Sequence, residues 1–386
     1  TTHQLIDPSQ HGFTKGKNLD TALAAYLSII STCIDKNIPC LGLFIDFTKA
    51  FDCVSHSLLL KKLERYGVRG VALQLFRSYL SGRTQKVLVN NTLSAEVGIT
   101  VGVPQGSILG PILFIIFIND LLMLMKKSFN CSVMSYADDT NFIITGGDTT
   151  EVINKATNIY TLAQKWVTKN KLCINHEKTA FTFFSNTANC AEFTLNLNNI
   201  TIACSPSIKL LGISFDNHLK WCSYIDHLCS KLASVCYALK NIMRQCNFST
   251  AKQLYFANFQ SLLKYGITHW GLSPDFNRVF ILQKRAVRIL GGLKNRHSCR
   301  STFHQHGILT LPSLYICEIL SYTYKNINNF KNNRTEHEHN TRHKDLLLPR
   351  QHKTAHYQRS LHFNCCKFFN SFDCDIKNAS NFLVFK

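Results

Sequence analysis

The chain has 386 residues, of which 45% are apolar, so it can bury a sizeable core, and this composition excludes an intrinsically disordered protein. Its 43 Lys and Arg outnumber 23 Asp and Glu, and the resulting formal charge of +20 favours a polyanionic partner, with nucleic acid ahead of an anionic membrane. The chain starts at Thr1 without a basic-then-apolar leader, which predicts a fragment or processed product of an intracellular protein.

The first part of the chain alternates strand and helix patterns up to about residue 215. The apolar run 41–45 ends at Asp46 and predicts a buried strand with an acid at its end. Ser55 is placed to cap a helix that runs to about Tyr66, and Gly67 predicts a left-handed stop for that helix.

The most apolar run covers residues 108–125 and follows a Gly-rich loop. It contains Pro111, Asn119 and Asp120, which suit a buried helix better than a membrane span. No membrane passage is therefore expected.

Residues 131–145 predict a hairpin whose turn holds Asp138 and Asp139. Asp148 and Glu151 then have the spacing of a capping box, which marks the start of a helix. A helical apolar stripe follows this box and predicts that the helix covers one face of the sheet; its members are Val152, Ala156, Ile159, Ala163, Trp166 and Val167.

Past residue 215 the pattern becomes mostly helical and strongly basic. Between Asp216 and Arg300 there are 13 Lys and Arg against 3 acids, so half of the net charge lies in this part, which predicts contact with a nucleic-acid backbone. The stretch 332–359 is rich in His, Asn, Arg and Thr and predicts a flexible surface segment. No Cys/His spacing in it matches a zinc site.

The 16 cysteines include no Cys-x-x-Cys pair. Their scattered spacing favours buried thiols in a reducing compartment over a disulfide scaffold or a zinc site. Cys222, Cys229 and Cys236 recur every seven residues, which predicts a core stripe on one helix face.

The acids at strand ends carry the chemistry of the chain. The pair Asp138 and Asp139 lies in SYADDTNFII at 135–144, and such a pair can be an ordinary turn because Asp is common in turns. A further acid, Asp46, lies in FIDFTKAFD at 44–52, at the end of the predicted strand 41–45. Two separate strands therefore each carry an acid at one end. Converging carboxylates repel unless a cation lies among them, and hard oxygen ligands suit Mg²⁺. Two such ions can activate a 3′-hydroxyl and stabilise a leaving pyrophosphate.

Further segments, in the matching order, resemble the reverse transcriptases of non-LTR retrotransposons, the jockey-like and related LINE elements. They are HGFTKGK at 11–17, GVPQGSILGPILFIIFINDL at 102–121, INHEKT at 174–179 and KLLGISFDNHLKW at 209–221. The resemblance continues through YFANFQSLLKYGITHWG at 255–271 and QKRAVRIL at 283–290, and it weakens after about residue 330. The Asp46 segment, the Pro-Gln-Gly loop and the Tyr-Ala-Asp-Asp turn form a highly specific combination.

This resemblance implies an α+β fold, a right-hand polymerase with fingers, a palm on a ferredoxin-like antiparallel sheet and a helical thumb. Residues 1–215 would form the fingers and palm, 216–300 the thumb, and 301–386 a C-terminal extension with a polar flexible segment. Two Mg²⁺ ions, or Mn²⁺ in their place, would be held mainly by Asp46 and Asp138, with Asp139 in support.

The resemblance also implies nucleotide-binding residues. Phe51 falls on the aromatic steric gate, where a ring under the sugar leaves no room for a 2′-hydroxyl, although it can also be a core Phe. Gln105 lies in a flexible loop that can approach the incoming nucleotide and template, or it belongs to a structural loop. Lys15 and Lys17 match the basic fingers segment at the triphosphate, or a solvated loop, and Lys178 is a proton donor to pyrophosphate or a surface Lys.

Two further groups are expected to touch the nucleic acid. Leu210, Leu211 and Gly212 resemble the primer grip, a tight hairpin that steers the 3′ end, and equally fit a plain hairpin. Lys284, Arg285 and Arg288 are expected on the thumb at the duplex backbone. The alternative for them is a solvated helix whose apolar residues Ile281, Leu282, Val287 and Ile289 pack on the palm.

The leading hypothesis is an RNA-directed DNA polymerase that extends a nicked-DNA 3′ end on its own element's RNA. The alternatives are a catalytically silent nucleic-acid-binding remnant and a related RNA-dependent RNA polymerase or intron maturase. The expected partners are an RNA template, a DNA primer or target and dNTPs, in the cytoplasm and nucleus. An endonuclease domain is expected in the full-length polypeptide and has no counterpart in this sequence.

Overall fold

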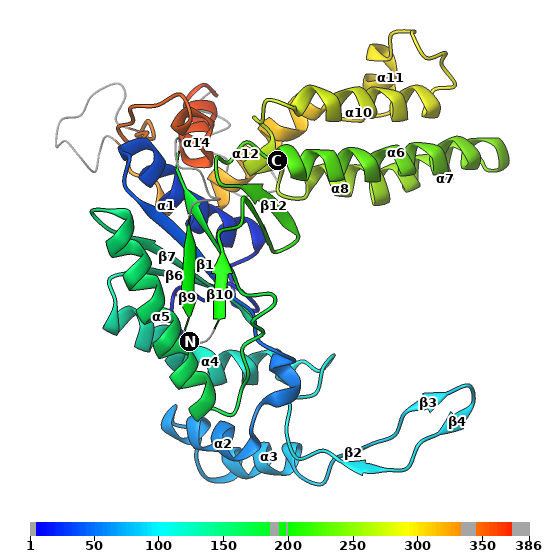
Figure 1. Ribbon diagram of the computed structural model, residues 1–386. Coiled ribbons are helices and arrows are strands. Elements are labelled where there is room, and N and C mark those ends of the chain that lie inside the picture. The colour runs from blue at the N-terminus through cyan, green and yellow to red at the C-terminus, as the bar shows by residue number, and fades with distance from the viewer. Residues whose placement is uncertain (1–4, 186–192, 198–199, 333–344, 373–386) are drawn as a thin grey trace. The chain divides into compact units, whose positions relative to one another are not determined.

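The computed structural model describes residues 5–185, 193–197, 200–332 and 345–372 (Figure 1). It divides into two compact units. The first comprises Thr1–Tyr26 and Asn37–Pro206, and the second comprises Leu27–Lys36 and Ser207–Lys386. Helix α1 (Leu19–Lys36) therefore contributes its two halves to different units.

The first unit is built on a four-stranded antiparallel sheet. Its strands are β1 (Cys40–Ile45), β6 (Ser132–Tyr136), β7 (Asp139–Thr145) and β8 (Ala180–Phe184), in the order β6-β7-β1-β8. Helix α4 (Leu109–Ser128) connects β1 to β6, and helix α5 (Thr149–Lys169) connects β7 to β8. This β-α-β-β-α-β order is the ferredoxin-like arrangement, so the predicted α+β fold class and palm sheet are confirmed.

Strand β1 is buried on both faces, and its residues alternate between two layers. Leu41, Leu43 and Ile45 belong to the core cluster that α4 and α5 cover. On the other face the Phe44 ring lies 5.7 Å from that of Tyr26 in α1. The close approach of α1 requires Gly42, because a Cβ there would lie 2.6 Å from the Tyr26 hydroxyl.

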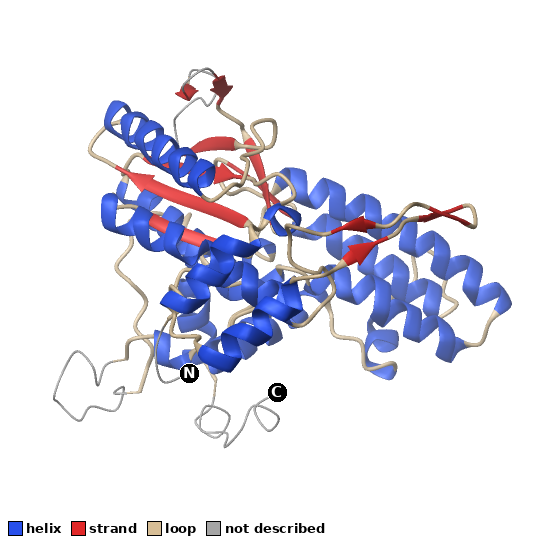
Figure 2. Ribbon diagram, turned by 90° about the horizontal axis from the view of Figure 1, so that it is seen from below, coloured by secondary structure: helices blue, strands red, loops and turns tan. Residues whose placement is uncertain are grey.

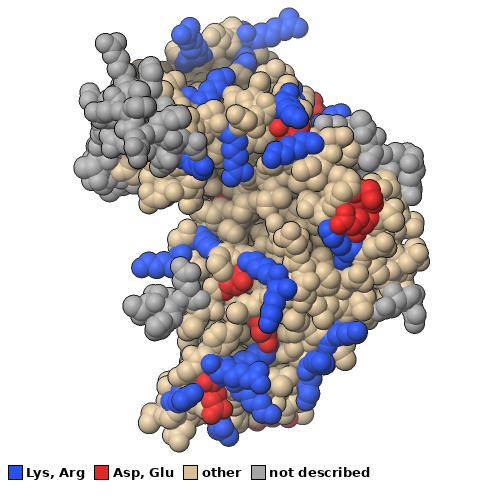
Figure 3. Space-filling model, turned by 90° about the vertical axis from the view of Figure 1, so that its left-hand side faces the viewer, with Lys and Arg blue, Asp and Glu red and all other residues tan. Residues whose placement is uncertain are grey.

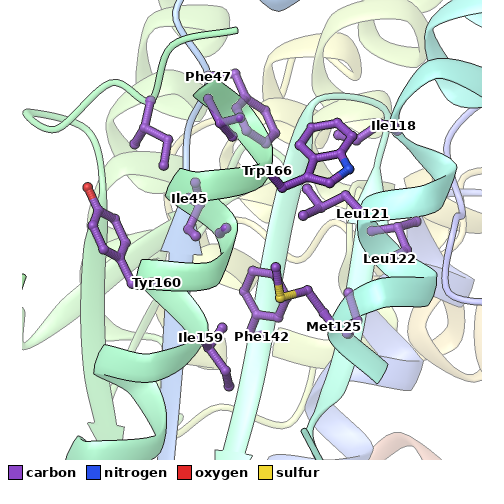
Figure 4. Close-up of a cluster of buried hydrophobic side chains, with 14 of the residues drawn as sticks. Ile45, Phe47, Ile118, Leu121, Leu122, Met125, Phe142, Ile159, Tyr160 and Trp166 are labelled. Atoms are coloured by element: carbon purple, nitrogen blue, oxygen red, sulfur yellow. The ribbon is translucent and has the colours of Figure 1, made fainter. Parts of the chain in front are cut away.

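Helices α4 and α5 pack on one face of the sheet (Figures 1 and 2). Trp166 of α5 lies beside Leu121 of α4, and Phe142 of β7 lies next to Met125 (Figure 4). By length and composition α4 could cross a membrane, but 56% of its apolar window is buried, as in the core helix of a globular unit. The expected buried helix at 108–125 is confirmed.

The start of α5 follows the predicted capping box. The Asp148 carboxylate accepts a hydrogen bond from the Glu151 backbone N–H at 2.8 Å. The Glu151 carboxylate accepts from the Gly147 N–H instead of returning to Asp148. All six residues of the predicted apolar stripe are buried, so this helix and its buried face are confirmed.

An insertion between β1 and α4 contains η1 (Ala50–Cys53), α2 (His56–Arg65), α3 (Gly70–Leu80) and the short strands β2 (Thr84–Gln85), β3 (Leu88–Val89), β4 (Thr92–Leu93) and β5 (Val97–Gly98). Helix α2 ends as predicted, with Gly67 at φ 90°. Ser55 is the N-cap residue of α2, as predicted, but its hydroxyl makes no cap bond and lies 3.2 Å from Ser57 Oγ. The unit ends with the hairpin β9 (Thr194–Leu197) and β10 (Ile200–Ala203).

The second unit begins with the hairpin β11 (Ser207–Leu210) and β12 (Ile213–Asp216) and continues as helices. These are α6 (Cys222–Gln245), α7 (Phe248–Leu254), the π-helical η3 (Tyr255–Gln260), α8 (Ser261–Lys264), α9 (Ile267–Trp270), α10 (Phe276–Leu290), α11 (Arg300–Gln305), α12 (Leu311–Lys325), η4 (Ile327–Asn329), η5 (Tyr357–Arg359) and α14 (Leu361–Asn370). Helix α10 packs along α6 (Figure 1). The division into a thumb at 216–300 and an extension at 301–386 stays a prediction.

One expectation for this unit needs correction, and another stays a prediction. Of the three cysteines in α6, Cys236 is buried, Cys229 is half-buried and Cys222 is exposed, so the predicted cysteine stripe is wrong. In the expected flexible stretch 332–359, residues 333–344 lie outside the described residues. In its later part the Asp35 carboxylate accepts hydrogen bonds from the Lys353 and Thr354 N–H groups, at 3.0 and 2.8 Å, and the flexibility of the stretch stays a prediction.

Candidate active site

The three acids predicted from the sequence lie at one end of the sheet of the first unit. Asp46 directly follows the last residue of β1, and Asp138 and Asp139 lie at the tight connection between β6 and β7. Because Ile45 pairs with Thr140, the antiparallel register brings Asp46 beside Asp139. Two neighbouring strands thus deliver carboxylates to the same place.

The hairpin turn that carries Asp138 has an unusual backbone. Tyr136 pairs with Asp139, which leaves Ala137 and Asp138 as a two-residue loop. Ala137 has a φ of 57°, and a positive φ at the first position of such a loop matches a type II′ turn, where glycine is preferred. An alanine in this conformation costs about 1–3 kcal/mol, which surrounding contacts must offset.

The loop after β1 is tied to the segment that carries Lys178. The Asn175 N–H donates to the Asp46 carbonyl at 2.8 Å, and the Thr48 N–H donates to the Cys173 carbonyl at 2.9 Å. These bonds bring the Lys178 ammonium to 3.8 Å from Asp46 Oδ2. A cation therefore lies beside the acids, as the prediction for Lys178 requires.

Burial and mutual repulsion perturb the acids of the turn. The pKa of Asp139 is raised to about 6, first by burial and then by the negative charges of Asp138 and Asp46. Burial also raises the pKa of Asp138, Asp46 raises it further, and Lys178 opposes the rise. A bound cation would relieve the repulsion that these shifts report.

The donor set suits a hard divalent ion that also binds substrate. Within the described ranges, no three His, Cys, Asp or Glu side chains are arranged to hold a metal ion alone. Mg²⁺ does not need such a cage, because it usually takes one or two carboxylates together with substrate phosphates and water. The carboxylate oxygens of Asp46 and Asp138 fit that requirement.

Phe51 lies five residues after Asp46, in the 3-10 turn η1. Its ring stacks on that of Phe114 in α4, with centroids 4.4 Å apart and planes at 27°. Its carbonyl accepts a hydrogen bond from the Val103 N–H at 2.8 Å. Phe51 is half-buried, so it packs against the core without being fully enclosed.

The Pro-Gln-Gly loop is fastened to the same turn. Gln105 Nε2 donates to Asp52 Oδ1 at 2.8 Å, and His56 Nε2 lies 2.7 Å from the Gly102 carbonyl. A Cβ at Gly102 would lie 2.8 Å from the Asp52 carbonyl oxygen, which explains the glycine. Asp52 and His56 were missed by the sequence reasoning. Asp52 could have been noticed as the second acid of FIDFTKAFD.

The two lysines of the fingers segment differ. Lys15 is exposed. The Lys17 ammonium donates to the carbonyl of Gln10 at 2.9 Å and also to the carbonyl of Pro8. Lys17 thus stabilises its own loop, and its contact with a triphosphate stays a prediction.

The residues expected at the primer grip lie in the second unit. Leu211 and Gly212 form the two-residue turn between β11 and β12, and their φ values of 49° and 80° match type I′. Leu210 is buried. The Tyr265 hydroxyl donates to the Leu211 carbonyl at 2.5 Å. A pocket of about 300 Å³ adjoins the turn and is lined by Gly212, Tyr224, His227, Leu228, Lys231, Leu262 and Tyr265.

The three basic residues expected at the nucleic-acid backbone lie on α10. The Lys284 ammonium lies 4.1 Å from the centre of the Phe280 ring, and Arg288 Nε donates to the His297 carbonyl at 2.8 Å. Arg285 is exposed. The apolar face of α10 packs along α6 within its own unit, and Ile281, expected in that face, is 61% exposed. Figure 3 shows another face of the molecule, the left-hand side of Figure 1, on which Lys and Arg side chains also outnumber those of Asp and Glu.

A ferredoxin-like sheet with three carboxylates at one end defines a polymerase palm, as the resemblance implied. The chain belongs to the reverse transcriptase (RNA-dependent DNA polymerase) family, whose model matches residues 1–215. The resemblance stated from the sequence is confirmed.

Known relatives cover more of the chain. It is 26% identical to the probable RNA-directed DNA polymerase from transposon BS of Drosophila melanogaster, over 75% of this chain and 33% of that protein. It is also 26% identical to the RNA-directed DNA polymerase from mobile element jockey of the same organism, over 74% of this chain and 32% of that protein. The chain spans about a third of the length of these relatives.

Among solved structures the chain is similar to telomerase from Candida albicans in complex with a fragment of telomeric RNA. The identity is 14% and the TM-score 0.40, over 80% of this chain and 55% of that one. Since this score is low, the fold assignment rests on the strand order of the sheet and on the family match.

Proposed function

We propose that the chain is the polymerase part of a non-LTR retrotransposon protein and adds dNTPs to a DNA primer 3′-hydroxyl on an RNA template. The observation that carries the proposal is the convergence of Asp46, Asp138 and Asp139 at one end of the sheet, where burial and then mutual repulsion raise the pKa of Asp138 and Asp139. The family match and the names of the relatives support it.

In this reaction Asp46 and Asp138 would hold two divalent ions, Mg²⁺ or Mn²⁺, with Asp139 in support. Such ions activate the 3′-hydroxyl and stabilise the leaving pyrophosphate. Lys178 lies beside Asp46, where its ammonium can neutralise a triphosphate oxygen and give a proton to pyrophosphate. The fold fixes these groups before substrate arrives, which is the source of electrostatic stabilisation.

Phe51 and Gln105 would shape the nucleotide site. Phe51 is held by its stack on Phe114, so its ring cannot move away readily to admit a 2′-hydroxyl. Gln105 is held by Asp52, which keeps the flexible loop next to the Phe51 turn. The expected substrate is therefore a dNTP in preference to an NTP.

We also propose that the basic helices of the second unit bind the duplex and that the full-length polypeptide carries an endonuclease domain. An element that copies its RNA into chromosomal DNA would work in the cytoplasm and nucleus. These partners and locations follow from the proposed reaction.

Primer extension on an RNA template tests the proposal. Asp46→Asn and Asp138→Asn should each lower extension by about 10²-fold or more, because the missing carboxylates act on the transition state. RNA binding should remain close to wild type. Asp226→Asn, the same change at an exposed acid paired with Arg278 in the second unit, is the matched control and should extend normally.

The alternatives give different results. A catalytically silent remnant would bind RNA without extending the primer, and an RNA polymerase would prefer NTPs over dNTPs. Near-normal extension by Asp138→Asn in Mg²⁺ would show that the site assignment is wrong.

A further inference from the structure

A short segment near the start of the described chain runs beside the hairpin that carries Asp138. Gln10 forms a parallel bridge with Ser135 of β6. The His11 N–H donates to the Ser135 carbonyl at 2.8 Å, and the Ser135 N–H donates to the Ser9 carbonyl at 3.0 Å. Residues 9–11 therefore pair with β6 at the edge of the sheet and bring the Gln10 side chain to the turn.

The Gln10 side chain is fully buried, and both the oxygen and the nitrogen of its amide make hydrogen bonds. Its Oε1 accepts from the Ala137 N–H at 3.0 Å and from the Gly12 N–H at 2.9 Å. Its Nε2 donates to Ser135 Oγ at 3.1 Å. A single oxygen thus connects the residue before Asp138 to a segment more than 120 positions away in sequence.

The turn needs this acceptor. Ala137 is buried, and its N–H belongs to the hairpin loop, outside the ladder between β6 and β7. An unpaired buried N–H destabilises the folded state, and the positive φ of Ala137 adds a second cost. The Gln10 amide removes the first cost and opposes relaxation of the turn to an ordinary φ.

Residues 9–12 and the Ala137–Asp138 turn that they hold, together called the clamp, are in close contact. A Cβ at Gly12 would lie 2.5 Å from the Ala137 nitrogen, so only glycine allows the segment to come this near. Two further hydrogen bonds fix the segment that carries Gln10. The Asp7 N–H donates to Asn119 Oδ1 of α4 at 2.7 Å, and the Lys17 ammonium donates to the Gln10 carbonyl at 2.9 Å. Lys17 thereby supports the clamp in addition to its predicted contact with substrate.

We infer that Gln10 is a positioning residue for polymerisation: it holds the Ala137–Asp138 turn so that the Asp138 carboxylate faces Asp46 and can share divalent ions with it. This inference rests on the proposed function. A displacement of about 1 Å in a reacting group can cost about 10²-fold in rate, so a residue that touches no substrate can control the reaction through Asp138.

The test variant is Gln10→Met, which keeps the length of the side chain and removes all three hydrogen bonds. Gln283→Met is a matched control, because Gln283 is also fully buried. Gln283 accepts from the Leu311 N–H at 2.7 Å and donates to the Leu309 carbonyl at 2.9 Å. Both variants should lose thermal stability to a similar extent.

Two measurements separate positioning from stability. The first is the Mg²⁺ dependence of primer extension at saturating template-primer. Gln10→Met should raise the half-saturating Mg²⁺ concentration several-fold and lower the limiting rate by about 10- to 100-fold. Gln283→Met should change neither when corrected for the folded fraction. The second is hydrogen exchange of the 131–145 hairpin. Gln10→Met should make this exchange faster than in the wild type. Added Mn²⁺ should slow the exchange in both proteins, but less in Gln10→Met.

Equal Mg²⁺ dependence and equal limiting rates in the two variants would overturn the inference, since Gln10 would then be merely a stabilising residue. If Gln10→Met does not fold, Gln10→Asn keeps the amide but is one methylene too short to reach both N–H groups. It should shift the Mg²⁺ half-saturation in the same direction, and no shift would count against the inference.

A wild-type chain that binds RNA but extends no primer would contradict the proposed function instead. Hydrogen exchange with and without Mn²⁺ would then decide the role of Gln10 by itself. If the hairpin of Gln10→Met exchanges at the wild-type rate and responds to Mn²⁺ as the wild type does, the inference that Gln10 holds the turn is wrong.

Discussion

Phe51 illustrates how one side chain can pack in a core and also select a substrate. Its stack on Phe114 fixes the ring, while the residue is only half-buried and so is not closed off from a substrate sugar. The sequence reasoning left core packing and steric exclusion open as alternatives, and the geometry is compatible with both acting together.

Phe51→Val should therefore raise the incorporation of NTPs relative to dNTPs, by about tenfold or more, because removing the ring frees the space of a 2′-hydroxyl. A competition assay with paired NTP and dNTP measures this ratio. Phe76→Val is the control, since Phe76 is also half-buried against the same core cluster. An unchanged ratio in Phe51→Val would leave Phe51 with packing alone.

Asp139 makes the stability of the first unit depend on pH. Its pKa of about 6 in the folded chain lies above the ordinary value of 3.8, so the folded state holds the proton more tightly than the unfolded state. The stabilising effect of that proton is fully present below about pH 4 and disappears as pH rises through about 6. The burial of the charged carboxylate and its repulsion by Asp138 and Asp46 then act against folding at neutral pH.

Asp139→Asn should thus raise the melting temperature relative to wild type near neutral pH and leave it nearly unchanged at about pH 4. Thermal unfolding at the two pH values, without divalent ions, measures the difference. Added Mg²⁺ should narrow the gap near neutral pH, because the ion neutralises the charge that the variant has removed. A gap that is equal at both pH values would show that Asp139 does not titrate as described.

At the scale of elements, patterns that arise within one strand or helix could be predicted from the sequence. Burial of β1 and the stripe of α5 follow from periodicity, and the acids follow from their places at strand ends. The cysteine stripe on α6 failed because seven residues fall about 20° short of two full helical turns. Cys236 lies four residues after the buried Leu232, so it falls on the buried face of the helix. Cys229 directly follows the buried Leu228, so its side chain points about 100° away from that of Leu228.

Contacts between distant elements could not be predicted in this way. The bond from Gln10 to Ala137 joins residues 127 positions apart, and the bond from Gln105 to Asp52 joins residues 53 apart. No local sequence pattern identifies such pairs, because the residues around each glutamine are typical of an ordinary loop and the partner is brought close only by the folded sheet.

The attachment of α2 to α4 depends on a buried lysine. The Lys62 ammonium donates to the Phe117 carbonyl at 2.6 Å and to Asp120 Oδ1 at 2.8 Å, and it lies 4.3 Å from the centre of the Phe117 ring. Burial lowers the pKa of Lys62, and Asp120 opposes that shift. The charge is therefore tolerated only because its partners are in place.

Lys62→Met should reduce the free energy of unfolding by about 1–3 kcal/mol, because the two charge-assisted hydrogen bonds of the ammonium are lost while the half-exposed Asp120 stays hydrated. Lys61→Met, at the exposed neighbouring position, should change it by less than about 0.5 kcal/mol. Denaturant titrations of both variants provide the comparison. Equal stability of the two would mean that the ammonium contributes no more than its aliphatic stem.

At the scale of the whole molecule, charge is divided unevenly along the chain. Residues 216–300 carry half of the net charge of +20, and the helices α6 and α10 that hold much of it pack together in the second unit. Lys284 and Arg288 each engage a neighbour of their own unit, whereas Arg285 is exposed. Cation–π contacts and carbonyl bonds leave the positive charge intact, so all three residues can still attract phosphate.

Replacing Lys284, Arg285 and Arg288 with Ala should weaken RNA and duplex binding to a similar degree for all sequences, because phosphate contacts carry no sequence information. The slope of log affinity against log salt concentration should fall by about 0.7–0.9 for each phosphate that the variant no longer neutralises. Filter binding across a salt series measures both quantities. The control removes the same charge from exposed positions of the first unit, with Lys61, Lys165 and Lys169 changed to Ala. If both triple variants lower affinity and slope equally, the effect is general electrostatics; if the α10 variant alone leaves them unchanged, α10 lies outside the nucleic-acid interface.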